Sequence, residues 1–243
     1  MRIIKVDAID STNRFLKDLN RVQKLVKPVS VIAHEQLSGK GQMGTIWQSD
    51  PGKNLTCSVF MRVDDILLSD QFYISMVTSL AVFDVLKDFM VSKVSVKWPN
   101  DILSDRQKIC GILIENIVKN GSLVGVIIGI GLNVNQTEFD QLPMAGSLKK
   151  IVGKNFDVNE VFNLLLKKIE KRFSELRVAN YQLIKNEYES ILFRKDKPST
   201  FENIEGESFV GIIKGVNPEG KLQLLLEDEV VQTFGLKEIK LLY

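Results

Sequence analysis

The chain has 243 residues, of which 44% are hydrophobic and 26% charged, with 16 glycines and 6 prolines. This composition is typical of a globular protein large enough for one or two domains, and it excludes collagen-like, fibrous and disordered classes. Lysine and arginine number 32 against 30 acidic residues, so the net charge of +2 gives no overall field for binding nucleic acid. Because no run of 18 apolar residues and no signal-peptide pattern is present, we expect a cytoplasmic protein that binds neither nucleic acid nor a membrane.

The first half of the chain is expected to combine strands and helices. β-Rich runs predict strands over 2–9, 29–36 and 54–62, and a glycine-dense loop occupies 38–53. A helix is expected after Asp10-Ser11-Thr12, whose side chains are suited to capping. Its predicted apolar residues are Phe15, Leu16, Leu19, Val22 and Val26. A central helix from Ser69 to about Met90 is predicted to bury one stripe formed by Phe72, Met76, Leu80, Phe83 and Leu86.

The second half is expected to contain a long hairpin, a long helical stretch and a group of short strands. A strand over 94–98 should end at Pro99, and two apolar runs flank Lys119-Asn120-Gly121, the Asn-Gly pair of a type I′ turn. Asp157 with Glu160 forms a capping-box pattern that opens a helical stretch through about Ser190. The apolar face predicted for it consists of Val161, Leu164, Leu165, Ile169 and Phe173. After Arg194–Pro198 the short strands are expected to close into a small β-barrel, so we predict two domains, 1–195 and 196–243.

Few residues are available for nucleophilic or metal chemistry. Cys57 and Cys110 are far apart in sequence, and neither has a neighbouring Cys or His at metal-ligand spacing, so no metal site and no disulfide framework are expected. The single histidine, His34, lies in the middle of a predicted strand, which favours a structural role over that of a catalytic base.

The glycine-rich segment 39–44 matches the dinucleotide fingerprint G-x-G-x-x-G. A Rossmann site requires a helix that starts inside this motif, whereas Ser49-Asp50-Pro51-Gly52 would end any helix within a turn. Two interpretations remain: a flexible surface loop, or a loop whose backbone N–H groups approach an anion while Lys40 adds charge and Trp47 covers an aromatic ring.

Two further segments suggest a binding site on the sheet. Lys97, on the strand before Pro99, is expected either to face solvent or to point into a cleft at the strand end. In the strand 124–134 one face is apolar, whereas the other carries Gly125, Gly129 and Gly131 before Asn133. Such a bare strand face is typical of close approach by a ligand, with a bulge or a closely packed helix as the alternative. The Asn133 amide offers a donor and an acceptor that match the edge of an adenine.

Together these segments resemble the biotin protein ligase family. The resemblance rests on D-S-T-N at 10–13, E-Q at 35–36, G-K-G-Q-M-G-T-I-W at 39–47, G-K-N-L at 52–55, K-W-P-N-D at 97–101, K-I-C-G-I-L-I-E at 108–115 and G-I-G-L-N at 129–133. It implies an α+β fold, with a mixed β-sheet catalytic domain flanked by helices, of the class II synthetase-like biotin/lipoate ligase type, followed by a small SH3-like β-barrel.

The resemblance also implies a reaction and its site. Biotin and ATP would give biotinyl-5′-adenylate and pyrophosphate, and a lysine of a biotin carboxyl carrier protein, from acetyl-CoA carboxylase or a related enzyme, would then attack the adenylate. Lys97 and Lys40 would be the catalytic residues. The residues implied for biotin are Ser11, Thr12, Gln36, Gly39, Lys40, Lys97, Gly111 and Gly129, and those for ATP are Trp47, Lys97, Asn100, Lys108, Gly131 and Asn133. Mg²⁺ would enter with the ATP phosphates rather than in a preformed cage, and a homodimer is left open.

The sequence departs from the family in two ways. Members commonly carry the loop G-R-G-R-R-G-R, whereas Lys40, Gln42, Met43 and Thr45 stand at its arginine positions. Lysine does not replace the bidentate guanidinium, so we expect the adenylate to leak faster than in arginine-rich members. Asp10-Ser11 lies too close to Met1 to leave room for the N-terminal winged helix of some members, so no operator binding is expected.

Three other functions are weighed. A lipoate ligase or octanoyl transferase shares the architecture, although K-W-P-N-D at 97–101 and the glycine loop favour biotin. A non-catalytic adaptor would use the C-terminal barrel to bind peptides and would be indifferent to Lys97→Ala. A nicotinamide-dependent oxidoreductase, the literal reading of the glycine fingerprint, lacks the required helix.

Overall fold

The larger part of the chain is built on one seven-stranded sheet. The computed structural model describes residues 1–140, 142–178 and 181–243, and of Met43 only the backbone. The strands are β1 (Arg2–Ile9), β2 (Val29–Gln36), β3 (Leu55–Arg62), β4 (Val94–Lys97), β5 (Asp101–Ser104), β6 (Gln107–Lys119) and β7 (Ser122–Leu132). Their order is β1-β2-β3-β7-β6-β5-β4; β1 and β2 are parallel, and every other neighbouring pair is antiparallel. The mixed sheet predicted for the catalytic region is therefore confirmed.

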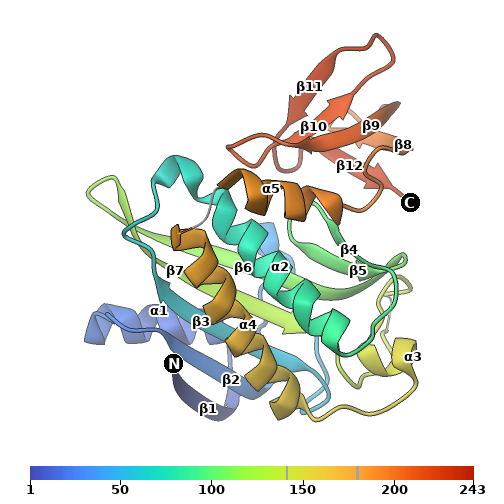
Figure 1. The fold of residues 1–243 in the computed structure, drawn as a ribbon. Helices are drawn as coiled ribbons and strands as arrows, with labels where there is room; N and C mark the ends of the chain where they lie inside the picture. Colours follow the sequence, from blue (N-terminus) through green and yellow to red (C-terminus); the bar gives the residue numbers. More distant parts are fainter. Residues whose placement is uncertain (141, 179–180) are drawn as a thin grey trace.

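Helices cover both faces of this sheet. On one face lies α1 (Thr12–Gln23), which packs on β2, β3 and β7. The other face is crossed by α2 (Phe72–Asp88), with α4 (Val158–Val178) and α5 (Tyr181–Ser190) packed against α2 (Figure 1). The short helix α3 (Leu148–Val152) and 3₁₀ turns at Gln42–Gly44 and Leu68–Asp70 complete the set. No helix within the described ranges is both long enough and apolar enough to cross a membrane.

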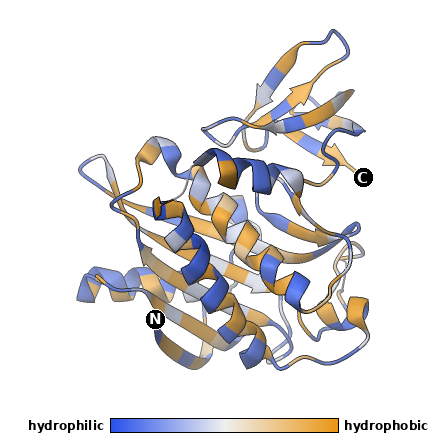
Figure 2. Cartoon of the chain, viewed as in Figure 1, coloured by the Kyte–Doolittle hydropathy of each residue, from blue (hydrophilic) through white to orange (hydrophobic). Residues whose placement is uncertain are grey.

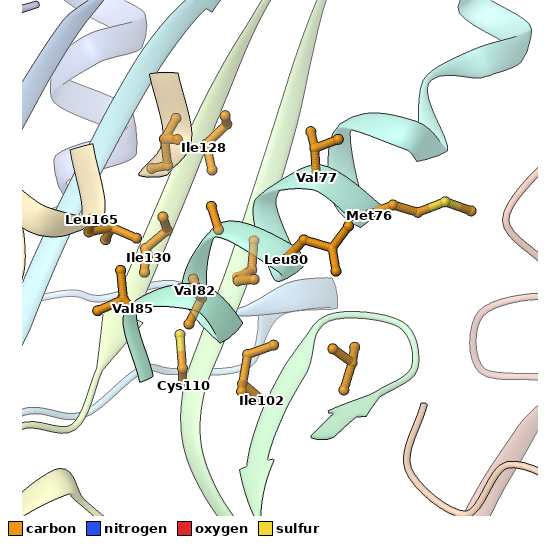
Figure 3. Packing of buried hydrophobic residues seen from close by; sticks show 14 of the residues in the cluster. Met76, Val77, Leu80, Val82, Val85, Ile102, Cys110, Ile128, Ile130 and Leu165 are labelled. Atoms are coloured by element: carbon orange, nitrogen blue, oxygen red, sulfur yellow. The ribbon is translucent and has the colours of Figure 1, made fainter. Parts of the chain in front are cut away.

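Alternation along β7 explains why both faces are covered. Ile128 and Ile130 join the larger core with α2, whereas Ile127 joins a smaller core with Leu16 of α1. Figure 3 shows the larger core, in which side chains of α2 lie with Ile130 of β7 and Ile102 of β5. The strand pattern of period two thus separates two cores on opposite sides of one sheet.

The central helix buries more than the single stripe predicted for it. Tyr73, Ile74 and Val77 are buried beside the predicted positions, whereas the predicted Phe72 and Phe83 are only half-buried. The reason is that α2 lies between the sheet and the two helices α4 and α5, so it is enclosed on most sides. Figure 2 shows the polar residues of α4 and α5 gathered on their outer surfaces, where these two helices meet solvent.

Three local predictions need correction. Val22 and Val26 are 77% and 70% exposed, because α1 ends at Gln23 and its buried face is formed around Leu16. The single helical stretch expected to Ser190 is two helices, α4 and α5, and residues 179–180 between them lie outside the described residues. The short elements β5, α3 and β8 were not anticipated. The predicted type I′ turn is confirmed, since Asn120 and Gly121 have φ values of 52° and 76°.

The C-terminal residues form a second, antiparallel sheet. Its strands are β8 (Pro198–Asn203), β9 (Ser208–Val216), β10 (Leu222–Leu225), β11 (Val231–Phe234) and β12 (Ile239–Leu242), in the order β11-β10-β9-β8-β12. This sheet fits an SH3-like domain, although among the described strand pairings none joins β11 to β12 to close a barrel. Figure 1 shows it next to α5 and the β4–β5 corner, at one end of the larger sheet.

Candidate active site

A cavity of about 590 Å³ lies where the glycine-rich loop, the β4–β5 corner and the C-terminal sheet meet. This volume is in the range usual for small-molecule sites. Most of the predicted site residues line it: Ser11, Thr12, Gln36, Lys40, Trp47, Lys97, Asn100, Lys108, Gly111, Gly129 and Gly131. Gly39 and Asn133 do not line the cavity: Gly39 lies against Gln36 and Trp47, which do, whereas Asn133 follows Gly131 two residues along the chain. The structure thus brings together predicted residues from Ser11 to Gly131 and adds residues of the C-terminal sheet as far as Leu241.

The start of α1 supplies a polar corner of the cavity. Ser11 is the N-cap, and its hydroxyl accepts the Arg14 N–H at 3.4 Å. The backbone N–H and the hydroxyl of Thr12 both donate to Oε1 of Gln36, at 2.9 and 3.0 Å. Ser58 Oγ lies 2.7 Å from the Thr12 hydroxyl. Because these groups orient one another, the corner presents fixed donors and acceptors to a polar ring.

The glycines of β7 do approach another group closely, but at Gly129 this group is a side chain of the protein. A Cβ on Gly129 would overlap Oδ1 of Asn13. Asn13 is itself held by Nδ2, which donates to Oε2 of Glu115 at 2.9 Å, and by the Ser58 hydroxyl 2.5 Å from its Oδ1. The closely packed helix that was the alternative for the bare strand face therefore applies at Gly129.

At Gly131 and Gly111 the close neighbour is the Trp47 ring. A Cβ on Gly131 would overlap the indole, and one on Gly111 would lie 3.0 Å from it. Trp47 is brought there by the glycine-rich loop. Its backbone N–H donates to the Gly39 carbonyl at 2.9 Å, and a Cβ on Gly39 would overlap the Trp47 carbonyl. Gly39 therefore allows the two sides of the loop to meet. The loop places the Trp47 ring on the bare backbone of Gly131 and Gly111, as an adenine site would require.

Two buried polar atoms of the predicted site residues have no partner among the described residues. They are Nε1 of Trp47 and Oδ1 of Asn133. The other half of the Asn133 amide is used, since Nδ2 donates to the Gly146 carbonyl at 2.9 Å, and the side chain is only 4% exposed. Leaving buried polar atoms unpaired is costly, so these two point to a ligand with matching groups.

The cationic part of the site is formed by Lys97 and Lys108. Lys97 is the last residue of β4. The corner Trp98-Pro99 then turns the chain into β5, where Asp101 pairs with Lys97 in register. Lys108 Nζ binds Asp101 at 2.7 Å and lies 5.7 Å from the centroid of the Trp47 ring. Burial lowers the pKa of Lys97, and the nearby cations Lys108 and Lys240 act in the same direction against the opposing effect of Asp101.

Lys97 therefore lines the cleft rather than facing solvent, which decides between the two interpretations of its position. A partly buried ammonium in a cavity of this kind can neutralise an anion and favour negative charge that develops on it. Asn100 is less free to act, because one N–H of its Nδ2 already donates to the Ile112 carbonyl at 2.5 Å, which leaves Oδ1 and the second N–H.

The rest of the glycine-rich loop is exposed at the mouth of the cavity. Lys40 and Thr45 are exposed, and Lys40 pairs with Ile46 through an isolated bridge that closes the loop. Gln42 lines the cavity, and its carbonyl accepts from the Thr45 N–H and hydroxyl. The side chain of Met43 lies outside the described part. The loop is thus ordered by its own backbone, and Lys40 is the only cation in the sequence of residues 39–47.

Several residues of the cleft have no counterpart in the sequence predictions. Asn13, Ser58, Asp101, Phe193 and Tyr243 contact predicted site residues or line the cavity themselves. Of these, Asn13 and Asp101 lie inside motifs already quoted, so the motifs could have indicated them. His34 does not line the cavity; it is exposed on β2 and its ring lies against Gly52. Both cysteines are buried and free, and burial raises the pKa of Cys57 to about 12.

Comparisons with known proteins agree on one family. Residues 6–133 match the model of the biotin/lipoate A/B protein ligase family. The chain is 30% identical over 241 residues to the bifunctional ligase/repressor BirA of Escherichia coli (strain K12), covering 96% of this chain and 72% of that protein. It is 30% identical over 199 residues to the biotin--[acetyl-CoA-carboxylase] ligase of Mycobacterium tuberculosis, covering 81% and 73%.

Solved structures show the same fold along the whole chain. The biotin protein ligase of Aquifex aeolicus in complex with biotin and ATP superposes with a TM-score of 0.83 at 25% identity, covering 99% of this chain and 98% of that one. The biotin protein ligase of Leishmania major in complex with biotinyl-5-AMP superposes with a TM-score of 0.68 at 20% identity, covering 96% and 98%. At that identity the second likeness concerns the fold alone.

Proposed function

Because this chain belongs to the biotin/lipoate A/B protein ligase family, we propose that it is a biotin protein ligase. It activates biotin with ATP and transfers the biotinyl group to a lysine of a carrier protein. The relatives described above are named as biotin ligases, and the Aquifex enzyme was solved with biotin and ATP bound. These names favour biotin over lipoate or octanoate, and an ATP-dependent ligase over a non-catalytic peptide adaptor.

One observation carries the proposal at the level of chemistry. A single cavity holds a network of fixed polar groups around Thr12 and Gln36, an aromatic ring on bare backbone, and the ammonium groups of Lys97 and Lys108. This combination suits a neutral polar ring linked to a carboxylate at one side and a purine nucleotide at the other. The protein's task in such a reaction is to orient two anions and to screen their repulsion.

The first step joins the two substrates. A carboxylate oxygen of biotin attacks the α-phosphorus of ATP, the bond from the α-phosphorus to the bridging oxygen breaks, and pyrophosphate leaves. Lys97, with Lys108 beside it, neutralises charge on the carboxylate and the α-phosphate, and Lys40 approaches them from the loop. We expect Mg²⁺ to arrive with the ATP phosphates, because Mg²⁺ is usually held by one or two carboxylates together with the phosphates of the substrate.

The substrates are oriented by the remaining residues. Ser11, Thr12 and Gln36 bond the ureido ring of biotin, with Gly39, Gly111 and Gly129 beside its chain. Trp47, whose ring lies on Gly131, packs on the adenine. The free Oδ1 of Asn133 accepts from the adenine amino group. In the second step the amine of the carrier lysine attacks the acyl carbon of the adenylate, and AMP leaves.

The division into domains and the association of two copies of the chain belong to the same proposal. The catalytic unit comprises residues 1–195, and residues 196–243 form a small domain that contributes a wall of the cavity. Two copies of the chain associate through an edge strand of the seven-stranded sheet. Sedimentation velocity at several protein concentrations tests this association. A purely monomeric boundary at the highest concentration contradicts it.

The deciding experiment is biotin-dependent exchange of labelled pyrophosphate into ATP. We expect exchange with biotin that lipoate neither supports nor inhibits, and loss of exchange by at least about a hundredfold in Lys97→Ala, because a preorganised charge in an active site contributes on that scale. Lys87→Ala, which removes an exposed lysine of α2, is the matched control and should keep full exchange. Exchange driven by lipoate, or exchange that survives Lys97→Ala, contradicts the proposal.

A further inference from the structure

The ammonium of Lys97 lies against an aromatic ring from the C-terminal end of the described chain. Nζ of Lys97 is 4.7 Å from the centroid of the Tyr243 ring. Tyr243 in turn meets Phe193 edge to face, with ring centroids 5.1 Å apart and an interplanar angle of 67°. At this distance a cation is attracted by the electron-rich face of the ring.

This arrangement is built by two separate parts of the fold. Tyr243 directly follows β12, which is fixed to β8 of the C-terminal sheet by the pairing of Leu242 with Thr200. Phe193 is fixed to the edge of the large sheet, since its N–H donates to the Val96 carbonyl at 2.8 Å, one residue before Lys97. The ring therefore reaches Lys97 from the C-terminal sheet and is held there by an aromatic residue anchored next to Lys97.

Within the described part of the chain, the charged groups that act on Lys97 do not provide it with a free anion. Asp101 of β5 is already bound to Lys108 of β6 at 2.7 Å, and Lys108 and Lys240 of β12 are cations. A neutral ring stabilises the buried ammonium without cancelling its charge. An ammonium held in this way can still pair with an incoming carboxylate or phosphate, whereas one locked to a carboxylate would first have to exchange partners.

We propose that Tyr243 is a positioning residue for adenylation, whose ring face holds the Lys97 ammonium in the cavity in the position where the biotin carboxylate and the α-phosphate of ATP meet. This inference rests on the proposed function. It gives the C-terminal sheet a defined part in the first chemical step, which is to bring an aromatic ring to the catalytic lysine.

The test compares variants at position 243 in the full-length chain by biotin-dependent pyrophosphate exchange. Tyr243→Leu removes the ring face, so kcat should fall about tenfold while the KM for ATP and for biotin changes less than about twofold. Tyr243→Phe keeps the face and should restore kcat to within about twofold of the unsubstituted protein. The control is Phe234→Leu, which removes an aromatic residue that packs on Phe209 of the same sheet and does not line the cavity; its kcat should not change.

The pH profile separates positioning from a merely structural effect. The ring favours the charged form of Lys97, so its loss lowers the lysine pKa further, and the alkaline limb of the exchange rate should move to lower pH by roughly half to one unit in Tyr243→Leu. Tyr243→Phe should keep the limb of the unsubstituted protein. If Tyr243→Leu does not fold, phenylalanines carrying increasing numbers of fluorine atoms at position 243 weaken the ring face with little change of shape, and kcat should fall progressively along that series.

The outcomes distinguish this inference from the proposed function. A folded, unsubstituted protein without biotin-dependent exchange contradicts the proposed function itself. If that protein shows exchange but Tyr243→Leu and the fluorinated series keep its kcat and its alkaline limb, the positioning role is wrong while the ligase function stands. A fall in kcat that Tyr243→Phe does not restore also contradicts the role assigned to the ring.

Discussion

At the scale of single residues, the amide of Asn133 is half used by the fold and half available. Its Nδ2 supports the Gly146 carbonyl, whereas its buried Oδ1 has no partner among the described residues. In the ATP site proposed above, an acceptor at that point would favour the amino group of adenine and oppose the carbonyl oxygen that guanine carries at the same position. Nucleotide selectivity should therefore depend on this one side chain.

We predict that Asn133→Ala raises the KM for ATP by roughly 5- to 150-fold, which corresponds to about 1–3 kcal/mol for one hydrogen bond in a buried site. The KM for biotin should stay within about twofold, and the preference for ATP over GTP should decrease. Steady-state pyrophosphate exchange measures all three quantities. Asn116→Ala, at an exposed position on β6, is the control, and an equal rise in both KM values would show a general loss of structure instead.

The second prediction at this scale concerns retention of the adenylate by the loop. Gln42 lines the cavity at a position where arginine-rich family members have a guanidinium. We expect Gln42→Arg to slow release of biotinyl-adenylate by roughly three- to tenfold, because a bidentate, charge-assisted contact to the phosphate is gained. Gln42→Lys adds the charge without the planar fork and should slow release less. Rapid filtration of preformed adenylate complex gives the rates, and equal release from all three proteins contradicts the role assigned to arginine.

At the scale of elements, one guanidinium ties three helices together. Arg172 of α4 binds Asp84 of α2 at 2.8 Å and Glu187 of α5 at 2.7 Å, and its side chain is only 11% exposed. Burial opposes its charge, but the hydrogen bonds that it donates to Glu187 and Asp84 outweigh this effect and raise the pKa of Arg172. The layer above the sheet is therefore held by an ion cluster in addition to apolar packing.

We predict that Arg172→Met lowers the free energy of unfolding by about 2–4 kcal/mol, since removing one member of a partly buried ion cluster leaves its partners uncompensated. Lys171→Met provides a matched control on the same helix, because Lys171 is 68% exposed and its ion pair with Glu175 is 3.7 Å long. That control should change stability by less than about 0.5 kcal/mol. Urea unfolding followed by circular dichroism measures both, and equal effects of the two substitutions would show that the cluster does not hold the helices.

Elements that are specified locally could be predicted from the sequence, and elements specified by their surroundings could not. The hairpin of β6 and β7 follows from an Asn-Gly pair between apolar runs, which needs no information from elsewhere. The burial of α2 depends on α4 and α5, which pack on it from more than 70 residues away, so its sequence pattern alone suggested one stripe. The strand β8 has weak local signals and exists because β9 and β12 pair with it.

The same distinction applies to the candidate site. The glycines of β7 stand out because glycine is unusual in a strand, whereas Lys97 is indicated only by the resemblance to the family, since its strand pattern leaves its direction open. Asn13 over Gly129 and Tyr243 over Lys97 are contacts between distant segments, and nothing in either local sequence indicates its partner. Tyr243 in particular is far from every motif of the cavity in sequence, so only the packing of the two sheets brings it to Lys97.

At the scale of the whole molecule, the two sheets share one core. Phe201, Ile213 and Leu222 of the C-terminal sheet belong to the same buried cluster as Met76 and Leu80 of α2. Polar contacts add to this apolar continuity: the Trp98 indole N–H donates to the Gly220 carbonyl at 2.8 Å, and Glu189 accepts the Val216 N–H at 2.9 Å. A cavity whose walls come from both sheets keeps its shape only while these contacts hold.

A shared core predicts cooperative unfolding of both sheets. We expect one calorimetric transition with equal calorimetric and van't Hoff enthalpies, and coincident midpoints for far-UV circular dichroism and for the fluorescence of the two tryptophans, Trp47 and Trp98. Phe201→Ala removes a fully buried ring from the C-terminal sheet at a cost of about 3–5 kcal/mol. Because both tryptophans belong to the larger sheet and its loop, their midpoint should fall together with that of the circular dichroism signal. If tryptophan fluorescence kept its midpoint while part of the dichroism signal was lost earlier, residues 196–243 would unfold independently, and the ring on Lys97 would be lost before the catalytic sheet itself unfolds.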